Sequence, residues 1–363
     1  MFRETLAGLL LAVPMPLPAQ ALPAPKKIRI AEGIYLFITA PYGDAGLDGN
    51  SIAILTPDGV LVFDSNGTPA AASAVLAEIK AMTSAPVRYL VNSHWHWDHW
   101  YGAEVYRQAF PGIQIITHEK TRQMMMGPEL AFNKPGLDRD LPQHIAMVEE
   151  RVKALAGSSP GSPELERARR HLEQDRFFLE QKSGIHRTVA NLTFTDSLTI
   201  YLGEREIRVL HYDRAVTPGD TFLYLPKEKV LVTGDLLVNP ISFALSCYPS
   251  GWLATLEKID ALDAAVLVPG HGEPLHDKAL LETHIAIFRE LLRRGREAHA
   301  KGQTADQAAA AALPELKELM VRLTHDDPNL NQQFGVYLVD WYLHRVYDEL
   351  EGKLSDEIVV PRH

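Results

Sequence analysis

The segment NSHWHWDHWYG, residues 92–102, contains three histidines and an aspartate within six positions. It directly follows the apolar run VRYLV, which is typical of a buried β-strand. If the chain stays extended beyond that strand, His94 and His96 point to the same face as Asp98. His99 can join this row as the chain turns toward a helix. Neutral imidazoles and a carboxylate at close spacing are ligands for zinc or a similar divalent ion. The segment therefore predicts a metal site.

Two later segments each place one further ligand type just beyond an apolar strand. KVLVTGDLL contains Asp235, and AVLVPGHGEP contains His271. Taken singly, Asp235 could be a helix N-cap and His271 a turn residue. In this chain order after the first motif, they instead indicate the carboxylate and the imidazole that complete a metal site.

Short β-type runs bounded by turn signals alternate with helical segments in the first third of the chain. One such helix is predicted over Pro69 to Met82, and the alternation predicts an α/β layered domain over residues 28–276. A helical insertion interrupts it at about 119–185. Residues 277–363 are predicted to form a C-terminal helical extension, with a capping box at Thr304 and Gln307.

Residues 157–161, GSSPG, match the G-x-S-x-G pattern of a serine nucleophile. That nucleophile sits on a turn between a strand and a helix. Here the match falls in a Ser/Pro/Gly turn between two helical segments, so we assign it no catalytic role.

The bulk composition restricts the partners. The formal net charge of the 363-residue chain is −10, which argues against the basic surface that nucleic-acid binding requires. Hydrophobic residues make up 46% of the chain, enough for a substantial core. A soluble enzyme with a small-molecule substrate fits these values, and the oligomeric state is left open.

The N-terminal segment, residues 1–21, is typical of a cleaved signal peptide. Arg3 precedes a short apolar run, and AQA forms a cleavage signal that ends at Ala21. The run is too short to span a membrane, so we expect a periplasmic or secreted protein without membrane insertion after cleavage. Cys247 is the sole cysteine, which excludes an internal disulfide.

The motifs HWHWDH, TPGDT, VLVTGDLL and PGHG occur in that order between about Gly33 and Pro274. In this respect the chain resembles the metallo-β-lactamase superfamily of metal-dependent hydrolases. The resemblance implies an αββα sandwich, with two mixed sheets face to face, helices outside and the metals at one sheet edge. It further implies the ligand sets, which are His94 and His96 for a first metal, Asp98, His99 and His271 for a second, and Asp235 as a bridge between them.

One position departs from the family pattern. By the resemblance, a histidine that completes the first metal site is expected where the chain has Val216, and valine has no lone pair to donate. His211 and Asp213 are the alternative donors in the same segment. We therefore expect one tightly bound zinc ion and a weakened first site, with iron or manganese as alternative metals. Restoring the imidazole by Val216→His is expected to raise the zinc content.

The function that these residues predict is hydrolysis by a metal-activated water. The expected substrates contain an ester, thioester, lactone or amide bond, with Asp98 and Asp235 as the catalytic carboxylates that orient or deprotonate the water. Zinc β-lactamases fit less well than the glyoxalase II and general hydrolase branches, because Asp235 stands where some of them have cysteine. Two alternatives are a non-hydrolytic metal- or ligand-binding protein on the same fold and an iron-dependent oxidoreductase of the persulfide dioxygenase kind.

Overall fold

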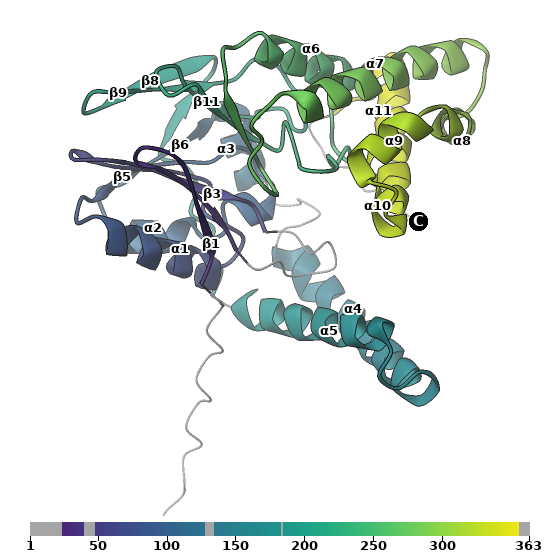
Figure 1. Cartoon of the computed structure of the whole chain (residues 1–363), viewed down its shortest axis with the longest axis horizontal. Helices are drawn as coiled ribbons and strands as arrows, with labels where there is room; N and C mark the ends of the chain where they lie inside the picture. Colours follow the sequence, from purple (N-terminus) through teal and green to yellow (C-terminus); the bar gives the residue numbers. More distant parts are fainter. Residues whose placement is uncertain (1–23, 40–47, 128–133, 183, 356–363) are drawn as a thin grey trace, which may run out of the picture.

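The computed structural model describes residues 24–39, 48–127, 134–182 and 184–355. The predicted signal peptide lies outside these residues. Two β-sheets pack face to face, and helices cover the outer face of each (Figure 1). Within the described part of the chain, no helix is both long and apolar enough to cross a membrane.

The first sheet contains seven strands in the order β1-β2-β3-β4-β5-β6-β7. Strands β1 to β4 pair antiparallel, and β4 to β7 pair parallel. Its strands are β1 (Lys26–Ala31), β2 (Ile34–Ile38), β3 (Ser51–Thr56), β4 (Gly59–Phe63), β5 (Val87–Val91), β6 (Gln114–His118) and β7 (Leu192–Phe194).

The second sheet contains five strands in the order β12-β11-β10-β9-β8. Strands β11 and β12 pair parallel, whereas the other neighbours pair antiparallel. Its strands are β8 (Ser197–Leu202), β9 (Arg205–Leu210), β10 (Phe222–Leu225), β11 (Val230–Gly234) and β12 (Val266–Pro269).

The period-2 alternation of the strands explains the layers. In β3, Ile52 and Ile54 pack against the second sheet, whereas Ala53 faces the helices on the outer side. The second sheet contributes residues such as Val209 and Val232 to the same inter-sheet core. Each fully buried side chain of this size contributes about 1.5–3 kcal/mol of hydrophobic stabilisation. The αββα architecture expected from the sequence is confirmed.

Helices α1 (Pro69–Met82) and α2 (Ala103–Ala109) cover the first sheet. The α1 bounds agree with the predicted helix, because Thr68 caps its N-terminus and Pro69 suits the first turn. Helices α6 (Pro249–Asp260) and α7 (Ala279–Ala300) cover the second sheet.

Two long antiparallel helices form a hairpin that projects from the sandwich (Figure 1). They are α4 (Lys134–Ser158) and α5 (Pro163–Lys182), and the short helix α3 (Glu119–Met126) precedes them. The G-x-S-x-G match covers the last two residues of α4 and the exposed turn that follows, and no strand precedes it as in a nucleophile elbow.

The C-terminal region is helical and packs on α6 and α7 through the aromatic side chains of Trp252, Phe288 and Tyr342. The predicted capping box of Thr304 and Gln307 is present at the start of α8. The π-helix in this region is not predicted by the sequence pattern. The elements are α8 (Ala305–Glu315), α9 (Lys317–Thr324), α10 (Pro328–Gln333), the π-helix η2 (Phe334–Asp340) and α11 (Trp341–Leu350).

Candidate metal centre

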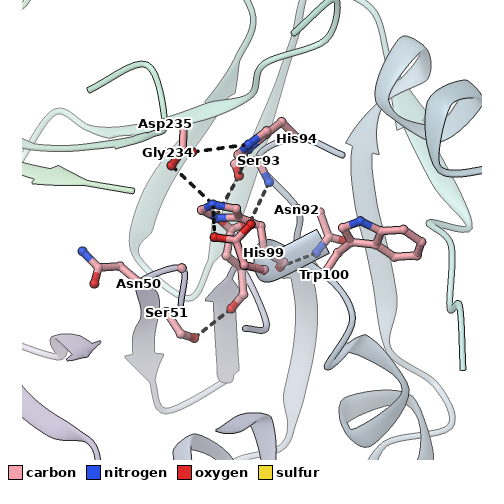
Figure 2. Close-up of polar contacts among 12 residues, drawn as sticks. Asn50, Ser51, Asn92, Ser93, His94, His99, Trp100, Gly234 and Asp235 are labelled. Atoms are coloured by element: carbon pink, nitrogen blue, oxygen red, sulfur yellow. Dashed lines mark hydrogen bonds and ion pairs between the residues drawn. The ribbon is translucent and has the colours of Figure 1, made fainter. Parts of the chain in front are cut away.

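Six potential metal ligands from four elements meet where strands of both sheets end. His94 and His96 follow β5, and Asp98 and His99 lie in or beside the 3₁₀ helix η1 (Trp97–His99). Asp235 follows β11, and His271 follows β12, which is the neighbour of β11 in the second sheet. Figure 2 shows His94, His99 and Asp235 pointing toward one another. The ligand set that the family resemblance implied is thus brought together in space.

The six side chains form two groups that share one carboxylate. We call His94, His96 and Asp235 the first ligand group, and within it the ligand atoms lie within 4.8 Å of one another. Asp235 Oδ2 lies 3.6 Å from His94 Nε2 in this group. Asp235 is buried at 7% exposure, so its carboxylate faces these donors rather than solvent.

The second ligand group consists of Asp98, His99 and His271, again within 4.8 Å. Asp98 Oδ2 lies 3.4 Å from His99 Nε2 and 3.2 Å from His271 Nε2. The other oxygen of Asp235, Oδ1, lies 3.3 Å from His99 Nε2 and 3.4 Å from His271 Nε2. Asp235 therefore directs one oxygen toward each group, which is the arrangement of a bridging ligand.

These separations suit a zinc-like ion. Two donors at 2.0–2.1 Å from a tetrahedral ion lie about 3.3 Å apart. Among the described residues, the buried atoms His94 Nε2, His99 Nε2 and Asp235 Oδ1 have no hydrogen-bond partner. Buried polar atoms are normally satisfied, and such an unsatisfied set of nitrogen and oxygen donors fits a divalent cation.

The charges divide the histidines into two classes. Burial lowers the pKa of His94 well below its usual range and that of His96 to about 4, so both are neutral donors at pH 7. Burial also acts to lower the pKa of His271, but the carboxylates of Asp235 and Asp98 outweigh it and raise that pKa to about 10. The pKa of His99 is raised against burial by Asp235, Asp98 and Asp64. Without a cation, these two imidazoles hold protons beside the carboxylates.

Asp64 contacts His99 of the second ligand group at Nδ1, the ring nitrogen that does not face the other ligands. The sequence analysis did not identify this residue. His99 Nδ1 lies 2.8 Å from Asp64 Oδ2, which fixes the ring so that Nε2 faces Asp98 and Asp235. The two oxygens of Asp64 also accept hydrogen bonds from the backbone N–H and the hydroxyl of Ser93, each at 2.7 Å. The available signal was an aspartate directly after the apolar strand β4, the pattern that singled out Asp235.

The residue before His271 is Gly270, and its backbone lies close to the side chain of Asp235. A Cβ added to Gly270 would lie 2.0 Å from Asp235 Oδ1, so a larger residue would displace the bridging carboxylate. Asn50 braces the same turn, because its side-chain amide donates to the carbonyls of Pro269 and Gly272, each at 2.9 Å.

The segment around Val216 contributes no residue to either ligand group. Val216 is buried at 1% exposure in the apolar core that contains Trp252. The two alternative donors do not join either ligand group. His211 stacks on His118 and hydrogen-bonds to the Asp220 carbonyl, while Asp213 accepts a bond from the N–H of Arg214. An imidazole at position 216 would be buried in the core, so Val216→His is now expected to destabilise the fold rather than to add a ligand.

Asp220 is the acidic side chain of this segment that the sequence reasoning passed over. Its carboxylate accepts hydrogen bonds from the N–H and the hydroxyl of Thr217, each at 2.9 Å. Burial raises the pKa of Asp220 to about 7, and the negative charge of Asp235 adds to the rise. Asp220 therefore lies within electrostatic reach of the bridging carboxylate.

Comparison with protein families identifies one match. The model of the metallo-beta-lactamase superfamily matches residues 44–271, more than half of the chain. The chain is 24% identical over 246 residues to a linear primary-alkylsulfatase from Pseudomonas sp. (strain ATCC 19151), which covers 66% of this chain and 44% of that protein. The chain thus spans less than half the length of this relative.

Solved structures of two metallo-beta-lactamases resemble the fold. The enzyme from Pontibacter korlensis has a TM-score of 0.51 and 16% identity, and the match covers 73% of this chain and 99% of that one. FIM-1 from Pseudomonas aeruginosa in the mono-zinc form has a TM-score of 0.52 and 12% identity, covering 75% and 98%. At these identities the similarity establishes the fold alone.

The support from Asp64 generates a first prediction. Asp64→Asn removes the charge that orients His99 and should weaken zinc affinity by about 10–100-fold. Competition with a chromophoric chelator measures the change. Asp58→Asn, in an exposed turn of the same sheet, is the matched control and should bind zinc as the wild type does. Equal zinc affinity in Asp64→Asn and the wild type would show that Asp64 has no such role.

The raised pKa values of His99 and His271 generate a second prediction. Zinc requires neutral imidazoles, so its binding at pH 7 should release about two protons per ion. The apparent affinity should accordingly rise with pH toward the His271 pKa of about 10. Calorimetry in buffers of different ionisation enthalpy counts the released protons. Zinc binding without proton release at pH 7 would contradict the assignment of these two ligands.

Proposed function

The chain belongs to the metallo-beta-lactamase superfamily, and from this premise we propose that it is a metal-dependent hydrolase of ester bonds. The observation that supports the proposal most strongly is the bridging geometry of Asp235, with one oxygen toward each ligand group. Hydrolysis is also the activity named for the alkylsulfatase relative.

The two ligand groups would hold the ion or ions, and zinc is the metal that their His and Asp donors suit best. A divalent ion held there would lower the pKa of water toward about 7 and would polarise the bond to be cleaved. Asp98 and Asp235 orient the attacking water, and Asp235 can accept its proton. Asp64 keeps His99 in the tautomer that presents Nε2 to the site.

A cavity beside His271 indicates the kind of substrate. It has a volume of about 270 Å³, and its apolar lining includes Ile38, Val238, Ile241, Phe243 and Tyr337. Among the described residues, its polar lining comes from neutral side chains together with Asp48 and His271, and this lining includes neither lysine nor arginine. Such a wall favours an apolar group on the substrate, and it leaves the metal site to neutralise any negative charge at the reacting end.

This combination favours an ester that joins an apolar carbon chain to an anionic group. An alkyl sulfate has that chemistry, and the alkylsulfatase relative makes it the first substrate to test. Carboxylic esters, thioesters, lactones and amides are the other bonds that a metal-activated water can cleave. The π-helix η2 contributes Tyr337 to the cavity wall, so the C-terminal helices take part in substrate selection.

We further propose that the two ligand groups differ in affinity. The second group has two imidazoles, the Asp98 carboxylate and an oxygen of Asp235, which completes the four donors that zinc prefers. The first group has two imidazoles and the other oxygen of Asp235, one donor fewer. Asp220 is the nearby carboxylate whose charge would assist a cation there, because it already interacts with Asp235.

A substrate panel tests the proposed reaction. The zinc-loaded protein should hydrolyse alkyl sulfates or another ester of the panel, and kcat/KM should rise with the length of the alkyl chain. Asp235→Ala should reduce both zinc retention and turnover by at least about tenfold. Asp263→Ala, an exposed carboxylate near β12, is the matched control.

Three results would overturn the proposed reaction. Full activity in a folded Asp235→Ala variant would exclude the bridging role. Failure to hydrolyse any substrate of the panel, together with oxygen consumption by the iron-loaded protein on a persulfide, would favour the oxidoreductase alternative. Failure of both reactions in metal-replete protein would favour a metal-binding protein without catalysis.

The role of Asp220 gives a separate prediction. Asp220→Asn keeps the size of the side chain but removes its charge, so the weaker class of bound zinc should lose about tenfold or more in affinity while the tighter class is unchanged. Zinc titration followed by elemental analysis resolves the two classes. Asp213→Asn, in the same loop, should titrate as the wild type does. If the zinc affinity of the weaker class is unchanged in Asp220→Asn, the role of Asp220 is restricted to its hydrogen bonds with Thr217.

A further inference from the structure

A second cluster of metal-ligand side chains lies in the α4–α5 hairpin, away from the strand ends. It consists of His144 from α4 with His171 and Asp175 from α5, and we call it the hairpin cluster. One ligand atom from each side chain lies within 4.8 Å of the other two. None of the three residues belongs to the ligand groups of the candidate metal centre, so the proposed hydrolysis does not use them.

Helix geometry explains the cluster. His171 and Asp175 are four residues apart on α5 and therefore lie on the same face. That face packs against α4, which supplies His144. Asp175 is fully buried, and the adjacent helix–helix contact is apolar, with Ile145, Val148 and Leu172. A carboxylate in such a place requires positive charge beside it.

The separations are those of the candidate metal centre. Asp175 Oδ2 lies 3.3 Å from His144 Nε2 and 3.6 Å from His171 Nε2. In the two ligand groups at the strand ends, the corresponding carboxylate–imidazole separations run from 3.2 Å to 3.6 Å. Two donors around a tetrahedral zinc-like ion lie about 3.3 Å apart. Charge-assisted hydrogen bonds between nitrogen and oxygen are shorter, at about 2.7–2.9 Å.

We propose that the hairpin cluster binds a divalent transition-metal ion of the zinc type, independently of the strand-end metal centre. Two imidazoles and a carboxylate are the protein ligands of a common class of zinc site, in which a water completes the coordination. His171 also lines a cavity of about 650 Å³ between the hairpin and the C-terminal helices, which gives solvent access for a fourth ligand. The ion would join α4 to α5 across their interface.

A third group of this kind shows why burial matters. Asp306, Asp340 and His344 also lie within 4.8 Å, but the Asp306 side chain is 82% exposed. Water solvates such a carboxylate well, so this group needs no cation and carries no proposal. Asp175, in contrast, has 0% exposure.

The experiment separates the two metal sites with variants of the full chain. The strand-end site is disabled by His94→Ala with His271→Ala, and zinc alone is the probe. After dialysis, elemental analysis of this background should still find about one equivalent of zinc per chain. Adding Asp175→Asn, which keeps the side-chain size, should remove that equivalent. Adding His276→Ala, an exposed histidine outside every ligand group, should leave it in place.

Thermal unfolding provides the second readout and needs no activity. Zinc should raise Tm of the background protein, because binding to the folded state alone stabilises it. Asp175→Asn, or His144→Ala with His171→Ala, should abolish that rise, whereas His276→Ala should not. Zinc content and a zinc-induced Tm rise that both survive these substitutions would overturn the proposal. So would a background protein that retains no zinc and shows no rise.

The alternative is that Asp175 and the two histidines pair with one another and with other side chains of the hairpin without a metal ion. It predicts that zinc raises Tm of neither the background protein nor the hairpin variants. This test measures zinc content and Tm, so its result does not depend on whether any substrate of the panel is hydrolysed. Likewise, loss of the hairpin site would not count against hydrolysis at the strand ends.

Discussion

The carboxylate of Asp235 lies between two sets of imidazole donors, and the packing of the two sheets holds it there. Its two oxygens face different ligand groups at 3.3–3.6 Å. A buried carboxylate in this position is stable only with positive charge around it, from protonated histidines or from a cation. The parallel pair β11–β12 brings Asp235 next to His271, and the packing of the two sheets brings both to the end of β5. Gly270 leaves the space that the carboxylate occupies.

Much of the centre could be predicted because its signals are local. HWHWDH concentrates four ligands after one strand, and a strand followed by Asp or His marks the two distant contributions. The alternation of strands with helical segments such as Pro69 to Met82 predicts an α/β layered domain, and the family resemblance adds the αββα order of the layers. The supporting residues could not be predicted in this way. Asp64 and Gly270 act through contacts with residues far along the chain, and only the tertiary structure shows which atoms meet.

The missing histidine at Val216 stays a prediction from the family pattern. The tertiary structure adds that the Val216 side chain lies in the apolar core and that His211 stacks on His118. The carboxylate that interacts with the centre from this segment is that of Asp220, four residues later. The hairpin cluster escaped sequence reasoning for a related reason, since His144 and Asp175 meet only when α4 and α5 pack together.

The helices outside the sandwich contribute residues to both cavities that the proposals use. The π-helix η2 supplies Tyr337 to the cavity beside His271, and the same residue lines the larger cavity that His171 reaches. One residue of the proposed substrate-binding wall and the proposed hairpin metal site thus lie on helices outside the two sheets, where specificity can change without disturbing the ligand groups.

The central claim is that the ligand groups at the strand ends bind the ion that performs hydrolysis. A crystal structure of the zinc-loaded protein, with anomalous scattering recorded at the zinc absorption edge, tests it most directly. We expect a strong peak among Asp98, His99, His271 and Asp235, and a weaker one between His94, His96 and Asp235. Zinc-loaded crystals of active protein in which neither position carries an anomalous peak would contradict the claim.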